Sequence, residues 1–243
     1  MYAPENEIIS LVNQCSRELP LGNPQQVLNR VILGDCIKVM QALPNSYVDL
    51  IVTDPPYAAH YRDRSGRQII NDDNTEWIYP AFSEMHRVLK PDAFCVSFYG
   101  WHKVDTFMAA WRKCGFRPVA HFTWVKSYSS RNGYYSAASH ESAFLLAKGR
   151  PRSLSNPPRD VLPWKYSGNK YHPTQKPVSA LQPLINAFSE PGDLVLDPFG
   201  GSGSTGIAAK LCNRRFLLIE KDEEYFQTAN ARVLAEDLGM TVF

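Results

Sequence analysis

The chain has 243 residues, of which 44% are apolar and 21% are charged, and its formal net charge is +2. This length and composition predict that residues 1–243 form a single α/β domain with a substantial core. Five scattered cysteines without a C-x-x-C pair argue against a disulfide framework and against a cysteine-based zinc site. The sequence shows neither a signal-peptide pattern nor a long apolar segment, which predicts a cytoplasmic protein without a membrane partner.

Short apolar strands alternate with helical stretches along the chain, after an amino-terminal extension over residues 1–28. The strands are predicted at 30–33, 48–53, 93–99, 119–125, 142–147, 194–196 and 216–219. The helices are predicted at 36–42, 77–89, 103–114, 178–188, 204–211 and 223–238. Near-continuous apolar strands separated by helices predict a doubly wound, mostly parallel sheet that is covered on both faces. No helix separates the strands at 119–125 and 142–147, which predicts an antiparallel hairpin at one edge.

The residues Asp54, Pro55, Pro56 and Tyr57 follow directly on the apolar strand at 48–53. Each proline fixes its φ angle and donates no backbone N–H, so the turn offers carbonyl acceptors without competing donors. Such a turn suits an exocyclic amino group, which can be held through its N–H bonds while its nitrogen lone pair stays free. Tyr57 adds a flat surface on which the ring that carries this amino group can stack. A turn-capping role for Asp54 is the alternative, but it leaves the Pro-Pro-Tyr sequence unexplained.

A second turn has the sequence DPFGGSGST and leads from the strand at 194–196 into the helix at 204–211. Its glycines let the backbone approach a ligand, as in nucleotide-binding turns. The G-K-[ST] ending of a phosphate loop is absent, and Asp197 and Phe199 suit a cationic or polar ligand better than a triphosphate. Glu220 ends the next strand, where it is placed to accept hydrogen bonds from a ribose diol. A tight structural turn with a surface glutamate is the alternative interpretation.

The segment from Lys126 to Lys176 contains nine lysines and arginines against two acidic residues, so it carries +7 and the rest of the chain −5. Tyrosines and tryptophans interleave with these charges, as on surfaces that neutralise phosphates and stack on bases. A solvated basic face is the simpler interpretation of the charge pattern alone. The candidate DNA-contacting loops lie within two segments, 61–74 and 127–171. The candidate DNA-binding residues in and beside them are Arg62, Arg64, Arg67, Lys126, Arg131, Arg150, Arg152, Arg159 and Lys165.

In their order, the two turns resemble the beta group of S-adenosylmethionine-dependent DNA amino-methyltransferases, in which the catalytic tetrapeptide precedes the cofactor turn. Two further segments agree with that group: Gly34-Asp35-Cys36 after the first strand, and the run from His172 to Pro177 with the sequence HPTQKP. Four motifs in one order argue against a chance match. The resemblance spans nearly the whole chain. It implies a Rossmann-like methyltransferase fold with a circularly permuted motif order and a seven-stranded sheet that contains one reversed strand.

The resemblance also implies a catalytic set and a cofactor-binding set, with S-adenosylmethionine as the cofactor and no metal. The catalytic residues would be Asp54, Pro55, Pro56 and Tyr57. The cofactor-binding residues would be Asp35, Cys36, Asp54, His172, Lys176, Asp197, Phe199, Gly201, Ser202 and Glu220. Within this second set, Glu220 would hold the ribose hydroxyls, and Asp35 and Cys36 would meet the adenine of the cofactor. His172 and Lys176 would lie beside its methionine end.

The implied reaction is methyl transfer to the N6 amino group of a DNA adenine that has left the base stack. Adenine is expected because Asp leads the tetrapeptide, whereas relatives that methylate the cytosine N4 amino group more often carry Ser there. Cytosine is the alternative target. A glutamine amide or RNA fits less well, because such relatives more often carry Asn in place of Asp54 and place the glycine motif first. An alternative from another class is a non-catalytic nucleic-acid-binding module that has kept the fold.

Only short segments are available for reading bases, which predicts a DNA recognition sequence that is short, relaxed or dependent on a second subunit. We expect a homodimer, because relatives of the beta group often pair. A restriction endonuclease partner and an orphan role are both compatible with these motifs.

Overall fold

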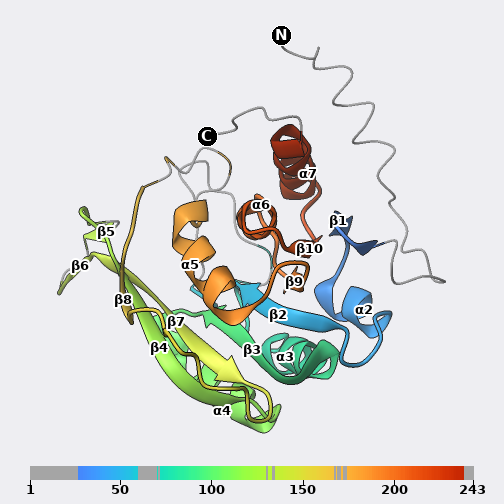
Figure 1. Cartoon of the computed structure of the whole chain (residues 1–243). Coiled ribbons are helices and arrows are strands. Elements are labelled where there is room, and N and C mark those ends of the chain that lie inside the picture. Colours follow the sequence, from blue (N-terminus) through green and yellow to red (C-terminus); the bar gives the residue numbers. More distant parts are fainter. Residues whose placement is uncertain are drawn as a thin grey trace.

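The computed structural model describes residues 27–59, 70, 72–129, 131–132, 135–166, 168, 171 and 174–237. The amino-terminal extension predicted at 1–28 and the segment predicted at 61–74 therefore lie largely outside the described residues. The described chain forms one mixed eight-stranded sheet with helices on both faces, and a separate two-stranded ribbon (Figure 1). This architecture confirms the predicted α/β fold class. No helix in the described part of the chain is long and apolar enough to cross a membrane.

One strand of the main sheet runs against all the others. The strand order is β1 (Arg30–Leu33), β10 (Arg215–Glu220), β9 (Leu194–Asp197), β2 (Val48–Thr53), β3 (Leu89–Phe98), β7 (His140–Ala147), β4 (Arg117–Val125) and β8 (Val161–Pro163). Neighbours are parallel except where they pair with β7, which is the predicted reversed strand. The main sheet exceeds the predicted seven strands because β8, for which the sequence predicted no strand, pairs with β4. The predicted antiparallel pair is present as β4 and β7, but β7 lies between β3 and β4.

The sheet separates two apolar cores. One face is covered by α2 (Cys36–Gln41), α3 (Ile78–Val88) and α4 (Val104–Lys113), and the other by α5 (Val178–Phe188), α6 (Ser204–Leu211) and α7 (Glu223–Asp237). Successive side chains of β10 alternate between these cores, as strand geometry requires. Phe216 and Leu218 join the core beneath α5, α6 and α7, whereas Leu217 and Ile219 join the core beneath α2, α3 and α4. Both faces are therefore buried, which explains the continuous apolar runs in the sequence.

The parallel strands β1, β10, β9 and β2 all end at the same edge of the sheet, which we call the carboxyl edge. In register, Leu33 pairs with Glu220, Leu218 pairs with Asp197, and Leu196 pairs with Ile51. The turns that leave these strands therefore meet at the carboxyl edge, as ligand-binding turns do in open α/β sheets. Three of the four sequence motifs lie on the turns after β1, β2 and β9, and the fourth, which contains Lys176, precedes α5.

Two smaller elements also lie toward the carboxyl edge. The short helix η2 (Trp101–Lys103) follows β3 directly. The ribbon of β5 (Arg131–Asn132) and β6 (Ala137–Ala138) connects the carboxyl end of β4 with the amino end of the reversed strand β7, and it projects beyond the main sheet (Figure 1).

Candidate active site

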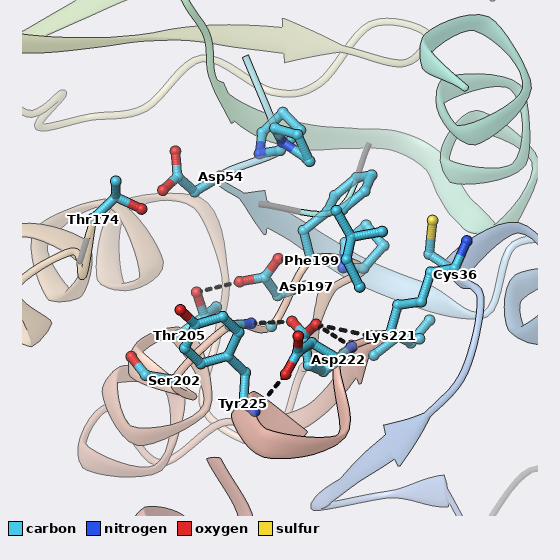
Figure 2. A pocket seen from close by; sticks show the side chains of 18 of the residues that line it. Cys36, Asp54, Thr174, Asp197, Phe199, Ser202, Thr205, Lys221, Asp222 and Tyr225 are labelled. Atoms are coloured by element: carbon cyan, nitrogen blue, oxygen red, sulfur yellow. Dashed lines mark hydrogen bonds between the residues drawn. The ribbon is translucent and has the colours of Figure 1, made fainter. Parts of the chain in front are cut away.

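A pocket lies at the carboxyl edge, where the turns after β1, β2, β9 and β10 meet (Figure 2). Its wall contains every predicted catalytic and cofactor-binding residue except His172, which lies outside the described residues. The wall also contains residues that the sequence did not single out for the site: Ile70, Asp72, Thr205, Lys221, Asp222 and Tyr225. The last three follow Glu220 directly or one turn later, so their position after the same strand is the signal that could have found them.

The glycine turn after β9 contains two positions with little room for a side chain. Gly203 has a φ of +85°, and a Cβ atom there would lie 3.1 Å from the Cα of Ala229 on α7. A Cβ atom on Gly200 would lie 3.1 Å from a side-chain atom of β10. Between them, the backbone N–H of Gly201 donates to Glu220 Oε2 at 2.7 Å. The turn is thereby fixed between β10 and α7.

Asp197 places a buried carboxylate under this turn. Its Oδ2 accepts from Thr205 Oγ1 at 2.6 Å, and its Oδ1 accepts from the backbone N–H of Phe199 at 3.1 Å. Burial raises the pKa of Asp197 to about 7, although these hydrogen bonds oppose the rise. No lysine or arginine forms an ion pair with Asp197 among the described residues. A cationic ligand in the pocket would therefore favour its ionised form.

Glu220 holds the backbone of two turns. Its Oε2 accepts from Gly201, and its Oε1 accepts from the backbone N–H groups of Lys221 and Asp222, both at 2.8 Å. Burial raises the pKa of Glu220, and the three hydrogen bonds oppose this rise. A carboxylate offers about four acceptor sites, so Glu220 can still accept from a ligand hydroxyl in the pocket.

At the end of the pocket beside β1, Asp35 caps α2. It accepts from the backbone N–H of Ile37 at 3.1 Å, and its Oδ2 pairs with Lys221 Nζ at 3.2 Å. Burial and the charge of Asp35 raise the pKa of Cys36 to about 12, so this thiol stays neutral. Phe199 also lines the pocket, and it packs edge-on against Trp77 with ring centroids 5.1 Å apart. A neutral thiol and an aromatic ring beside one carboxylate suit a flat heteroaromatic ligand.

Asp54 is held by two side chains at the carboxyl end of β2. Tyr57 Oη donates to Asp54 Oδ1 at 2.6 Å, and Lys176 Nζ donates to Asp54 Oδ2 at 2.6 Å. Burial raises the pKa of Asp54, and the Lys176 ammonium opposes that rise. Burial alone would lower the pKa of Lys176, but Asp54 and Glu141 raise it, so this lysine stays protonated. The three side chains form a carboxylate with two fixed donors.

A buried acid supports the turn that carries this carboxylate. Asp72 is 3% exposed, and its Oδ1 accepts from the backbone N–H groups of Tyr57 at 2.8 Å and Ala59 at 3.1 Å. The segment 61–74 was predicted to contain a DNA-contacting loop, and within it Asp72 faces the turn that carries the predicted catalytic residues. The two neighbouring acids Asp72 and Asp73 lie in a polar segment, and nothing in that pattern distinguishes the one that becomes buried.

Lys126 does not lie on an exposed basic face, contrary to the role in DNA binding predicted from the sequence. It is 7% exposed, and its ammonium pairs with Glu141 Oε1 at 2.5 Å. The ammonium also lies 5.1 Å from the ring of Trp164 and 5.9 Å from that of Tyr128. An ammonium with these partners is not available to DNA phosphates, because an exposed contact would require the buried Glu141 pair to break.

The other predicted DNA-binding residues do not all lie near the pocket. Arg62, Arg64 and Arg67 are outside the described residues, and Arg131 lies in β5. The side chains of Arg150, Arg152, Arg159 and Lys165 are exposed.

The reversed strand separates two members of this exposed group. Because β7 runs against its neighbours, Arg150 follows it at the amino ends of β3 and β4, where the Arg150 N–H donates to Asp92 Oδ1 at 2.7 Å. Lys165 follows β8, whose Pro163 pairs with Val125 at the carboxyl end of β4. Lys165 therefore lies toward the edge that holds the pocket, and Arg150 lies at the opposite edge.

Comparison with known proteins places this chain among DNA methylases. A family model for N6/N4 methyltransferases, described as DNA methylase, matches residues 48–231. The chain is 51% identical over 213 residues to "Putative methylase YubD" of Escherichia coli (strain K12). This alignment covers 88% of this chain and 93% of that protein. The crystal structure of the M1.HpyAVI-SAM complex has a TM-score of 0.68 and 26% identity, and the match covers 84% of this chain and 98% of that chain. The cytosine-N4-specific PvuII DNA methyltransferase has the same fold, with a TM-score of 0.68, 20% identity and coverage of 83% and 85%.

Proposed function

We propose that the chain methylates the N6 amino group of adenine in DNA with S-adenosylmethionine. The premise is that the chain belongs to the N6/N4 DNA methylase family and is a DNA methyltransferase. One observation carries the proposal: the Asp54 carboxylate is fixed by Tyr57 and Lys176 in the same pocket as the glycine turn. An acceptor for an amino group thus faces a nucleotide-type turn. The family membership supports an enzyme rather than a non-catalytic nucleic-acid-binding module.

The chemistry of the pocket wall suits S-adenosylmethionine. The buried Asp197 carboxylate, which has no ion-pair partner among the described residues, suits its positive charge, and the remaining acceptor capacity of Glu220 suits its ribose hydroxyls. The neutral wall near Asp35, Cys36 and Phe199 suits its adenine. Gly201 and Ser202 would border the ribose and methionine. When bound, the cofactor supplies a methyl group that its sulfonium makes labile.

Asp54 and Pro55 would hold the amino group that accepts the methyl. The bonds from Tyr57 and Lys176 occupy about half of the acceptor sites of the Asp54 carboxylate. Asp54 and the carbonyl of Pro55 can therefore accept both N–H bonds of an amino group. These bonds would orient the nitrogen so that its lone pair points away from the turn, which contributes to rate through positioning. Because Lys176 stays protonated, its role is to stabilise the Asp54 carboxylate and not to remove a proton.

DNA would approach the carboxyl edge. Trp101 in η2 is 80% exposed, and the preceding Gly100 packs so closely on Tyr57 that a Cβ atom at Gly100 would lie 2.8 Å from Tyr57 Cβ. Exposed aromatic rings beside single-stranded nucleic acid provide stacking surfaces for bases. Tyr166, which is 59% exposed, and Lys165 lie toward the same edge. These side chains would meet the strand from which the target base leaves.

Methyl transfer to unmethylated DNA tests the proposal. After incubation with tritiated S-adenosylmethionine, digestion to nucleosides and mass spectrometry should identify N6-methyldeoxyadenosine. N4-methyldeoxycytidine would instead establish cytosine as the target, the alternative that the fold shared with the PvuII enzyme supports. Asp54→Ala should abolish transfer while cofactor binding stays near that of the wild type. Substantial transfer by this variant would contradict the role of Asp54.

A further inference from the structure

Four charged side chains, two buried and two half-buried, form a chain from the ends of β4 and β7 to the turn after β2. Lys126 pairs with Glu141 at 2.5 Å, Glu141 Oε2 lies 3.8 Å from Lys176 Nζ, and Lys176 pairs with Asp54 at 2.6 Å. The exposed fractions of these side chains are 4%, 23%, 7% and 22% in that order. Cations and anions alternate, so the chain is neutral as a whole.

Each oxygen of Glu141 faces a different lysine. Burial alone would raise the pKa of Glu141, but Lys176 and Lys126 lower it, so the residue is an anion at neutral pH. A buried ion costs several kcal/mol unless it is paired, and removing one partner leaves an uncompensated charge. Glu141 with Lys126 alone would already be a balanced pair. The proximity of its second oxygen to Lys176 therefore calls for a reason other than charge neutrality.

Lys176 has a flexible side chain that needs restraint if it is to hold Asp54 in one orientation. Its ammonium lies 5.0 Å from the ring of Phe98 and 5.6 Å from the ring of Tyr57, contacts that allow rotation. Glu141 projects from β7, which is part of the main sheet, and it is the second carboxylate near this ammonium. A strand position is a rigid anchor for such a contact.

We propose that Glu141 is a positioning residue that holds the Lys176 ammonium against Asp54, with Lys126 as the counter-charge of Glu141. This inference rests on the proposed role of Asp54 as the amino-group acceptor. Glu141 is not part of the pocket wall, so it acts on the reaction through Lys176 and does not touch the cofactor. Neither Glu141 nor Lys126 lies in the segments that carry the resemblance to known methyltransferases.

Three variants and one control test this role in the full-length protein. Glu141→Gln removes the charge at nearly constant shape, and Glu141→Asp keeps the charge on a shorter side chain. The double variant Lys126→Met with Glu141→Gln removes one charge of each sign, so the group of four side chains stays neutral. No uncompensated charge is then left to destabilise the fold. Lys90→Met is the matched control, because it breaks the Lys90–Asp49 ion pair of 2.5 Å near the amino end of β2, away from the pocket.

The measurements are the single-turnover rate constant at saturating DNA and cofactor, and the calorimetric Kd for S-adenosylhomocysteine. We expect Glu141→Gln to lower the rate constant about tenfold or more, because misplacement of catalytic groups is costly, while Kd changes less than about twofold. Glu141→Asp should recover part of the rate. The double variant should stay as slow as Glu141→Gln, because Lys176 still lacks its second carboxylate, and Lys90→Met should match the wild type.

A double variant that regains the wild-type rate would overturn the proposal, since Glu141 would then serve only to neutralise Lys126. An unimpaired Glu141→Gln variant, or a parallel loss of S-adenosylhomocysteine binding, would overturn it as well. A wild-type protein that binds S-adenosylhomocysteine but methylates no DNA would instead refute the proposed function. An active wild type with equally active variants would refute the inference about Glu141 alone.

Discussion

Replacement of Asp197 by Asn should make the affinity for S-adenosylmethionine much less dependent on pH. Burial raises the pKa of Asp197 to about 7, and a cation bound beside it would favour the ionised form. With this pKa, about 3% of Asp197 is ionised at pH 5.5 and about 90% at pH 8. If only the ionised form binds the cofactor well, affinity should rise about 30-fold between these pH values, or about 2 kcal/mol. Asp197→Asn should bind more weakly at pH 8 and should lose this part of the rise.

Isothermal titration calorimetry with S-adenosylmethionine across this pH range measures the effect without DNA. Glu220, whose pKa is also raised, contributes to the pH dependence of both proteins, so the difference between wild type and Asp197→Asn isolates Asp197. Asp193→Asn is the matched control, because it changes an aspartate at the opposite end of the same strand, where the carboxylate accepts from the backbone N–H of Glu190. Identical pH profiles for the wild type and Asp197→Asn would refute the reasoning.

The same raised pKa has a consequence for the stability of the ligand-free protein, and its sign follows from linkage. A carboxyl group that binds its proton more tightly when folded stabilises the fold most below its unfolded pKa of 3.8. That contribution is lost as the pH rises toward about 7. Asp197→Asn should therefore gain thermal stability relative to the wild type as the pH increases from 4 to 7, and a constant difference in the unfolding midpoint would contradict this.

Three further predictions concern the catalytic carboxylate and the DNA-facing edge. Lys176→Met removes the cation that opposes the raised pKa of Asp54, so this pKa should rise further. The acidic limb of the pH profile of the methyl-transfer rate should then move to higher pH. An unchanged limb would show that Lys176 does not control the ionisation of Asp54. Trp101→Ala should weaken binding of DNA with an unpaired target base by about 1–3 kcal/mol, while Trp101→Phe should retain most of it. Lys165→Glu should weaken DNA binding and flatten its dependence on salt, whereas Arg150→Glu, at the opposite edge, should leave both near the wild type. Equal effects of the two charge reversals would place DNA on a different face.

The sequence predicted the elements because each one is encoded locally. Apolar runs predicted the positions of the strands, and prolines and glycines predicted where most elements end. The helix predicted at 178–188 has those bounds in the structure. The order of the strands is less accessible, because pairing depends on contacts between distant segments. The apolar run of β7 is consistent with burial of Ala143 and Leu145 in one core and Leu146 in the other, but no local pattern specifies that its neighbours are β3 and β4. The strand β8 has only three residues and pairs with β4 at the edge of the sheet, and so short a segment carries no periodic pattern in the sequence.

The residues of the candidate site also differ in how far the sequence predicts them. Residues on the turns after parallel strands were predictable, because the carboxyl ends of those strands meet at one edge. Lys126 was assigned to a basic surface because charge density in a sequence contains no information about burial, and only the tertiary structure shows its partner Glu141. Asp72 was hidden for a similar reason, since its two backbone donors lie 15 and 13 residues earlier in the chain. Buried polar side chains that act through long-range contacts are thus the part of a site that motifs miss.

The charge state of Asp54, the proposed amino-group acceptor, depends on such long-range contacts. Asp54 and Lys176 are 122 residues apart in the sequence. Burial disfavours the ionised form of Asp54, and the Lys176 ammonium is the main group that stabilises this form. Lys176 in turn keeps its proton because two carboxylates outweigh its own burial. An Asp-Pro-Pro-Tyr turn in the same fold without the lysine would have a carboxyl group with a higher pKa and less acceptor strength at neutral pH. The tetrapeptide therefore specifies the shape of the amino-group site, while its ionisation is set by Lys176 and by the residues that hold Lys176 in place.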